Sequence, residues 1–91
     1  DTDAHQGNGT NGIFTGDPRV FTYSLHVGRN YPAVKTPGSL DVELPRYAAG
    51  AEYLDSLVGT LGPAVRAFRP TLLVWIAGAD VHVDDRFGQL R

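Results

Sequence analysis

Two carboxylates and one imidazole stand where they could bind a single divalent metal ion. Asp3 and His5 lie near the start of the chain, and Asp80 closes a Gly-Ala-Asp segment that follows the apolar run 71–77. Side chains alternate between the two faces of an extended strand, so Asp1, Asp3 and His5 share one side. A zinc ion with three such protein ligands keeps a fourth position open for water or substrate, which is typical of a catalytic site.

The elements that must position these residues are two strands. Residues 1–5 are interpreted as the exit of one strand, and Thr71–Ala77 as a second strand that is apolar throughout. Such strands are usually central and parallel, with helices covering both faces of the sheet. Ligands bind at the carboxyl ends of parallel strands, so we expect Asp3, His5 and Asp80 to meet at one edge.

A helix is predicted between these strands. Apolar residues recur at three- and four-residue intervals from Ala51 to Phe68, at Leu54, Leu57, Val58, Leu61, Val65 and Phe68. Pro63 removes one backbone donor and clashes with the carbonyl of Gly59, so we expect a kink, or two helices meeting near Gly62. A strand, this helix and the strand Thr71–Ala77 would form a βαβ unit.

The rest of the chain predicts shorter elements. A short helix is expected over Thr10–Phe14 and a strand over Val20–His26, which is rich in β-branched and aromatic residues. Glycine and proline make 27–39 a loop, and the alternation in Leu40–Leu44 indicates a short strand. The sequence therefore predicts an α/β fold with a parallel sheet.

Composition and charge exclude several classes of function. The net charge is −2 and no block of like charge occurs, which argues against nucleic acid or a membrane surface as partner. No apolar stretch is long enough to span a bilayer. Cysteine is absent, which excludes thiolate metal sites and fits a cytoplasmic location.

The motifs of the chain resemble those of the histone deacetylase superfamily, most closely its bacterial and class IV-like members. The resemblance covers the whole chain and rests on Asp1-Thr2-Asp3-Ala4-His5-Gln6-Gly7-Asn8-Gly9, Phe21-Thr22-Tyr23-Ser24-Leu25-His26, Arg29-Asn30-Tyr31-Pro32, Ala77-Gly78-Ala79-Asp80 and Asp85-Arg86-Phe87-Gly88. It implies a three-layer α/β/α fold like that of arginases and deacetylases. The family domain is several times longer, so residues 1–91 are expected to be a central fragment of it.

The resemblance implies a zinc-dependent amidohydrolase. Its substrate would be acetyl-lysine in a protein or a similar small N-acetyl amine, attacked by water that the metal activates. Asp3, His5 and Asp80 would bind the zinc.

Two further side chains would orient catalytic histidines that precede residue 1. Asp1 matches the family carboxylate that hydrogen-bonds one histidine of a tandem pair. Asn8 stands where many members have an aspartate for the other, and without that charge the partner imidazole should be less basic. The tyrosine that stabilises the oxyanion would lie beyond residue 91.

A monovalent cation, usually potassium, would bind beside the zinc through Asp1, Ser24 and the backbone oxygens of Asp3, His5 and Leu25. The alternative for Ser24 is an ordinary strand hydroxyl.

Among the remaining candidates, Tyr31 matches an aromatic that lines the acyl channel, and the alternative is a loop aromatic packed on the domain. We interpret His26 as structural and His82 as an exposed loop residue. Asp84 departs from the glycine usual in this segment, and Asp85 and Arg86 match it without an assigned role.

Two functions from different classes remain open. The chain could be the metal-binding part of a deacetylase, or a non-catalytic binding or assembly domain of deacetylase descent. The intact metal-ligand set argues against the second function, because a binding domain has no need for two buried acids that face each other without a cation. The isolated chain is expected to be inactive and to bind zinc weakly, because neighbouring strands would be lacking. It is also expected to be poorly soluble, because the apolar strand Thr71–Ala77 would have an uncovered face.

Overall fold

A parallel pair of strands forms the centre of the chain, and the computed structural model describes all residues from 1 to 91. Strand β1 (Tyr23–Val27) pairs with β2 (Leu40–Leu44), with Leu25 opposite Val42. The prediction of Leu40–Leu44 is confirmed. The strand predicted over Val20–His26 begins later, because the Val20 N–H donates to the Asp17 carbonyl 3.2 Å away and so belongs to the preceding turn.

Residues 1–4 lie beside β1 on the edge opposite β2. The Leu25 N–H donates to the Asp1 carbonyl at 3.1 Å, and the Val27 N–H to the Ala4 carbonyl at 3.0 Å. The amine of Asp1 donates to the Tyr23 carbonyl at 2.8 Å. The first residues are therefore hydrogen-bonded as a parallel neighbour of β1, as the strand-exit interpretation requires, although they do not form a regular strand.

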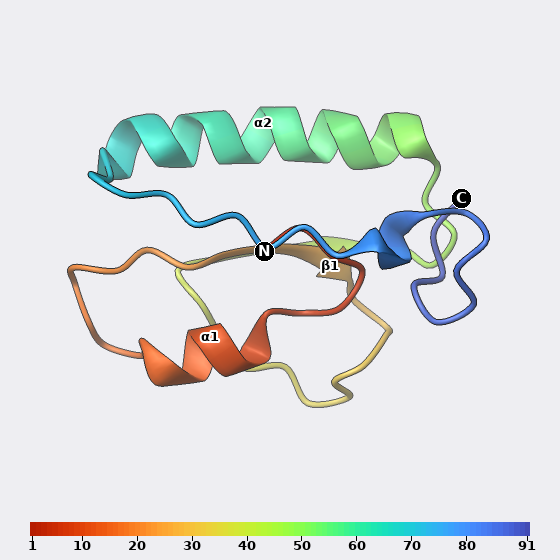
Figure 1. The fold of residues 1–91 in the computed structure, drawn as a ribbon, viewed down its shortest axis with the longest axis horizontal. Helices are drawn as coiled ribbons and strands as arrows, with labels where there is room; N and C mark the ends of the chain where they lie inside the picture. The colour runs from red at the N-terminus through yellow and green to blue at the C-terminus, as the bar shows by residue number, and fades with distance from the viewer.

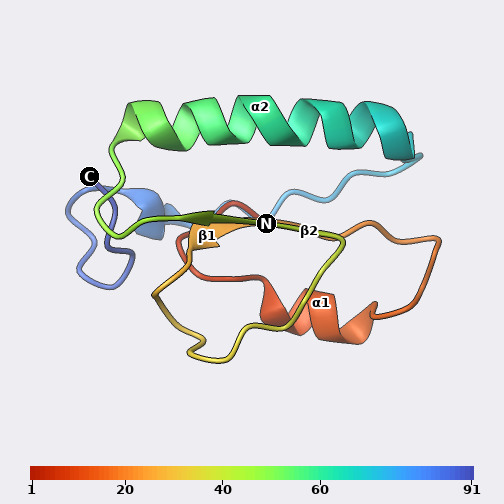
Figure 2. The same cartoon turned by 180° about the vertical axis from the view of Figure 1, so that it is seen from behind.

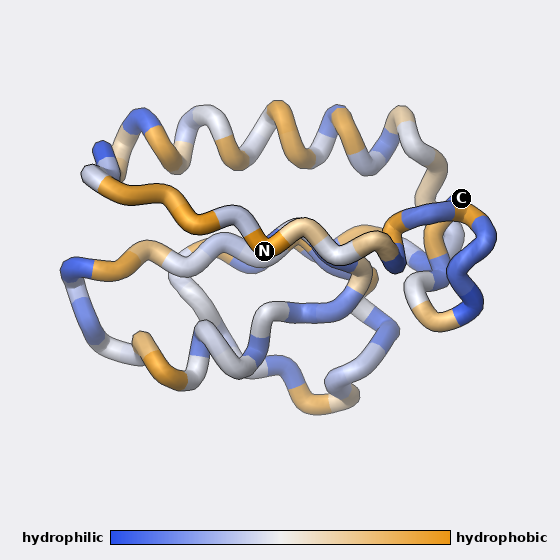
Figure 3. Tube along the Cα trace, in the orientation of Figure 1, coloured by the Kyte–Doolittle hydropathy of each residue, from blue (hydrophilic) through white to orange (hydrophobic).

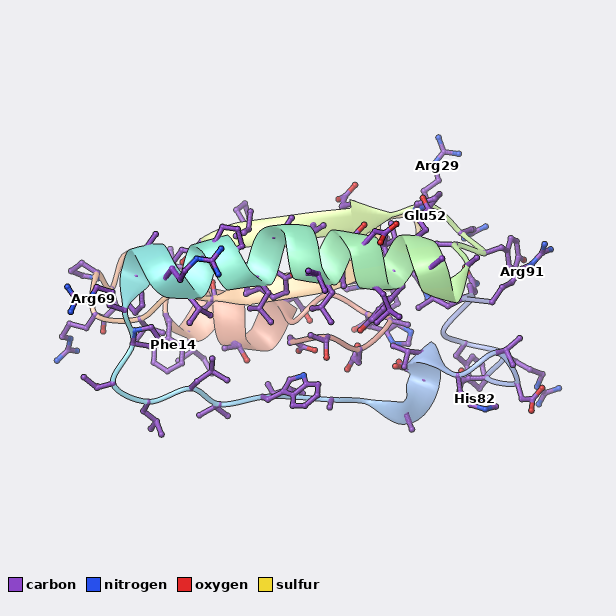
Figure 4. The ribbon with its side chains drawn as sticks, turned by 90° about the horizontal axis from the view of Figure 1, so that it is seen from above. Phe14, Arg29, Glu52, Arg69, His82 and Arg91 are labelled. Atoms are coloured by element: carbon purple, nitrogen blue, oxygen red, sulfur yellow. The ribbon has the colours of Figure 1, made fainter.

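The segment Thr71–Ala77 is mostly uncovered, as expected for the isolated chain, but it does not form the regular strand that was predicted. One backbone hydrogen bond joins it to residues 1–4: the Thr2 N–H donates to the Ile76 carbonyl at 3.0 Å. Its outer edge has no neighbour, as Figure 4 shows in a view from above the long helix. Exposed fractions remain high from Leu72 (79%) through Val74 (74%) to Ile76 (42%), and Figure 3 shows this hydrophobic stretch running beside the N-terminus.

Helix α2 (Gly50–Phe68) crosses one face of the sheet as a single helix. The expected break near Gly62 is absent, since Pro63 lies inside the continuous helix and Figures 1 and 2 show one uninterrupted rod. The helix ends at Arg69, whose left-handed backbone (φ 55°) directs its N–H to the Val65 carbonyl. Such left-handed caps are a common way for helices to end.

The apolar core lies between the sheet and α2. Its fully buried members include Leu25, Val27 and Leu44, and three residues of α2 pack on it: Tyr53, Leu57 and Leu61. Leu54 and Val58, predicted for the same apolar face, are instead 56% and 73% exposed. Turning Leu57 and Leu61 toward the sheet leaves those two side chains on the flank of the helix.

The opposite face of the sheet carries polar side chains. Ser24 and His26 of β1 are both buried there, and the short helix α1 (Asn8–Ile13) covers this side together with the loop between β1 and β2 (Figures 1 and 2). The chain thus has three layers, α2, sheet and α1, as the resemblance implied. A 3₁₀ turn, η1 (Ala79–Val81), follows the exposed segment. None of the helices combines the length and the apolar character needed to cross a bilayer.

The exposed segment predicts self-association of the isolated 91-residue chain. Val74→Lys should raise its solubility severalfold, because a charge on an unpaired apolar edge opposes strand addition. The measurement is the soluble monomer concentration by size-exclusion chromatography with light scattering. Val34→Lys is the matched control, since Val34 is 84% exposed in a loop; equal gains from both variants would show that net charge alone matters.

Candidate metal centre

Asp3, His5 and Asp80 meet at the carboxyl end of the sheet. One ligand atom from each lies within 4.8 Å of the other two, and all three residues are half-buried. The Nδ1 atom of His5 is 2.7 Å from Asp80 Oδ2 and 3.9 Å from Asp3 Oδ1. Ligand atoms of a tetrahedral zinc site are roughly 3.3 Å apart, given bonds of about 2.0 Å. The two distances from His5 Nδ1 each differ from that spacing by about 0.6 Å, so the donor set is suited to one such ion.

Backbone amides orient both carboxylates. Asp3 Oδ1 accepts the N–H of His5 at 2.7 Å, and Asp80 Oδ1 accepts the N–H of Ala4 at 3.0 Å. Asp80 Oδ2 is thereby left to face the imidazole. Outer hydrogen bonds of this kind fix the direction of a metal ligand and contribute to metal affinity.

Two glycines let the backbone approach the ligands closely. A Cβ on Gly78 would lie 2.5 Å from the Cβ of Asp3, and a Cβ on Gly88 would lie 1.7 Å from the carbonyl oxygen of Asp80. Any larger residue at either position must displace a ligand, which gives these glycines of the Gly-Ala-Asp and Asp-Arg-Phe-Gly motifs a physical role.

Thr2 connects the ligand-bearing segment to two other elements. Its carbonyl accepts the Tyr53 hydroxyl of α2 at 2.6 Å, and its Oγ1 accepts the indole N–H of Trp75 at 2.7 Å. Burial raises the pKa of the Tyr53 hydroxyl, so it stays a protonated donor. These contacts hold Asp3 from both sides, and the sequence patterns did not indicate them.

The predicted histidine-orienting residues lie next to the cluster. Asp1 Oδ1 accepts the N–H of Asp3 at 3.2 Å, and Asn8 begins α1 directly after the His5 turn. Their role toward histidines outside residues 1–91 stays a prediction.

The predicted monovalent-cation ligands lie on β1 and on the segment of residues 1–5. Ser24 Oγ accepts the Gly7 N–H at 3.1 Å and lies 2.9 Å from His26 Nδ1, while the Leu25 N–H bonds the Asp1 carbonyl. These hydrogen bonds also suit an ordinary strand hydroxyl, so cation binding at Ser24 stays a prediction.

Tyr31 is 71% exposed and stands over the cluster. Its ring centroid is 6.4 Å from that of His5, with an interplanar angle of 65°, an edge-to-face arrangement. We call this exposed ring beside His5 the rim aromatic, and its role in lining the acyl channel stays a prediction. The other exposed candidate, His82, lies in the loop beyond η1 as predicted (Figure 4).

Asp85 shapes the turn beside the cluster, and the sequence assigned no role to it. Its Oδ1 accepts the N–H groups of Phe87 and Gly88, each at 2.8 Å, and these bonds lower the pKa of the Asp85 carboxyl. The carboxylate thus closes the turn that places Gly88 against Asp80. The aspartate with glycine three residues later is a turn signal that could have predicted this.

Comparisons with known proteins identify the family of the chain. A family model described as the histone deacetylase domain matches residues 1–91. The chain belongs to the histone deacetylase family. An uncharacterized protein of Picosynechococcus is 42% identical over 90 residues, and the acetoin utilization protein AcuC of Staphylococcus aureus is 32% identical over 100 residues.

The fold of this deacetylase-family chain is shared with a solved structure. An acetylpolyamine aminohydrolase from Burkholderia pseudomallei matches 98% of the chain with a TM-score of 0.87 and 28% identity. The chain covers 30% of that protein, 30% of the Picosynechococcus protein and 25% of AcuC. It therefore spans less than a third of the length of the relatives it matches.

His26 predicts a pH dependence of stability. Burial lowers its pKa below the ordinary 6.5, outweighing the nearby Asp41 carboxylate. A histidine with a depressed folded pKa stabilises the fold fully above pH 6.5, and this contribution is lost as the pH falls through the folded pKa.

The free energy of unfolding from urea titrations should therefore decrease from about pH 7 to about pH 5. His26→Gln should flatten this slope, because the amide keeps a donor and an acceptor without titrating. His82→Gln is the matched control on an exposed histidine. An unchanged slope in the His26 variant would contradict the assignment.

Proposed function

We propose that this chain forms the metal-binding part of a zinc-dependent hydrolase that removes acetyl groups from acetyl-lysine or a small N-acetyl amine. The observation that carries the proposal is the convergence of Asp3, His5 and Asp80 within 4.8 Å. Family membership and the likeness to an acetylpolyamine aminohydrolase support the reaction class.

In this proposal the residues of the chain have three roles: binding zinc, lining the path of the acyl chain and orienting the catalytic histidines. Asp3, His5 and Asp80 would hold zinc, which when bound supplies a Lewis acid for the amide carbonyl and activates water. Tyr31 would line the path of the acyl chain beside His5. Asp1 and Asn8 would orient the tandem histidines that exchange protons with the attacking water and the leaving amine.

We further propose a potassium ion beside the zinc, with Asp1, Asp3, His5, Ser24 and Leu25 as ligands. The support is that residues 1–7 are bonded directly to β1 through Ser24 and Leu25. A cation there would offset part of the negative charge of Asp1 and Asp3. The cytoplasmic location stays a prediction.

Zinc binding tests the ligand set on the 91-residue chain itself. Calorimetric titration should give a dissociation constant weaker than micromolar, because the ligands are partly exposed and lack the neighbouring strands of a whole domain. Asp80→Ala should weaken binding at least about tenfold, the loss seen even for outer-shell partners.

Asp84→Ala is the matched control, since its side chain is 89% exposed near the same turn. Submicromolar binding would overturn the expectation of weak affinity. Equal effects of the two substitutions would remove Asp80 from the ligand set.

Hydrolysis tests the function in the whole protein. Zinc-loaded protein should release acetate from an acetyl-lysine peptide or from an N-acetyl diamine, and Asp80→Ala should lower kcat/KM by at least about a hundredfold. Asp84→Ala should stay within about twofold of wild type, as is usual for an exposed site.

No acetate release from either substrate would contradict the proposal and favour a non-catalytic domain of the same descent. The flanking sequence gives an independent reading: a His-His pair before residue 1 and a tyrosine after residue 91 support the enzyme.

A further inference from the structure

One side chain, that of Asn30, joins the loop that carries Tyr31 to the turn that follows Asp80. Its Nδ2 donates to the Phe87 carbonyl at 2.6 Å and is 3.3 Å from that of Gly88. Its Oδ1 accepts the N–H of Tyr31 at 2.7 Å. The amide therefore uses its acceptor on one loop and its donors on the other.

Each side of this connection leads to the metal cluster. Gly88 packs so closely on Asp80 that a Cβ would lie 1.7 Å from the Asp80 carbonyl. On the other side, the ring centroid of Tyr31 lies 6.4 Å from that of His5. The Nδ1 atom of His5 in turn lies 2.7 Å from Asp80 Oδ2. The rim aromatic and the metal-binding loop are thus tied together through Asn30.

The Tyr31 loop has its own internal support. The Nζ of Lys35 donates to the carbonyls of Asn30 at 2.7 Å and Pro32 at 2.5 Å, and the Asn30 N–H donates to the Val27 carbonyl. Loss of the Asn30 side chain would therefore free one loop from the other while these backbone bonds keep the loop in shape.

We propose that Asn30 is a positioning residue that holds Tyr31 as a fixed wall for the acyl chain. The inference rests on the proposed function. An aspartate at this position keeps the acceptor for Tyr31 but places a carboxylate oxygen, which cannot donate, against two carbonyl oxygens. Asn30→Asp therefore breaks the connection with almost no change of shape.

The kinetic test compares whole-protein variants on the better of the two acetylated substrates. Asn30→Asp should raise KM about tenfold, because the donor is lost and a carboxylate oxygen is set against two carbonyl oxygens, with kcat changed less than about threefold. Zinc affinity by calorimetry should stay within about twofold. Val34→Ala, an exposed position on the same loop, is the control and should match wild type in all three quantities.

An unchanged KM would overturn the proposal. A parallel loss of zinc affinity would also overturn it, because Asn30 would then support the ligands rather than the aromatic wall. Asn30→Ala replaces the aspartate variant if that protein does not fold.

Amide hydrogen exchange tests the connection without relying on activity. In Asn30→Asp, the N–H groups of Phe87 and Gly88 should exchange at least about fivefold faster, because their turn loses its tie to the Tyr31 loop. Unchanged exchange in that turn overturns the proposal even in an active enzyme. A wild-type protein that releases no acetate contradicts the proposed function, while the exchange result still decides whether Asn30 joins the two loops.

Discussion

Hydrogen bonding of residues 1–4 on both of their edges is the constraint on which the site depends. On one side Asp1 and Ala4 bond to β1, and on the other Thr2 bonds to Ile76. Ala4, at the centre of this arrangement, is completely buried. Because both neighbours are parallel, the carboxylates and the imidazole emerge at one edge of the sheet, where the chain returns with Asp80.

In the cluster of Asp3, His5 and Asp80, backbone hydrogen bonds offset the repulsion between two carboxylates. Two carboxylates and an imidazole share a half-buried space, and each carboxylate is anchored through one oxygen to a backbone N–H. Partly buried like charges repel unless a cation or a donor compensates them. Here the structure keeps them together because the backbone donors come from the same turn that carries His5.

The two faces of the sheet differ in polarity. Toward α2 the residues are apolar and supply the core, whereas toward α1 a polar network ties three elements together. In that network Asp41 Oδ1 accepts from Gln6 at 3.0 Å and from Asn11 at 3.2 Å, and both amides also donate to the Thr36 carbonyl. Buried amides satisfied in this way fix one conformation. The network holds the turn after His5 to the far end of the Tyr31 loop.

Several features could be predicted from sequence because they depend on local pattern or on motif spacing. The alternation in Leu40–Leu44 gave a strand at those bounds, and the three- and four-residue spacing gave the long helix. The Asp-x-Asp-x-His and Gly-Ala-Asp motifs brought together the three residues that the structure places within 4.8 Å.

Other features depend on what lies beside each residue, which one-dimensional pattern does not encode. The apolar run Thr71–Ala77 was predicted to be a strand, but without partners on its outer edge it forms no regular strand. Pro63 was expected to kink the helix or to divide it near Gly62, and one continuous helix runs through it. The bonds of Asn30 and Asp85 join or shape loops far apart in sequence.

The types of the candidate ligands, their order and the periodicity of the elements can be derived from residues 1–91 alone, because they follow from side-chain chemistry and local backbone geometry. The pairing of the edges, the amide that joins the two loops and the distances between the candidate ligands emerge only in the fold, because they depend on contacts between distant segments.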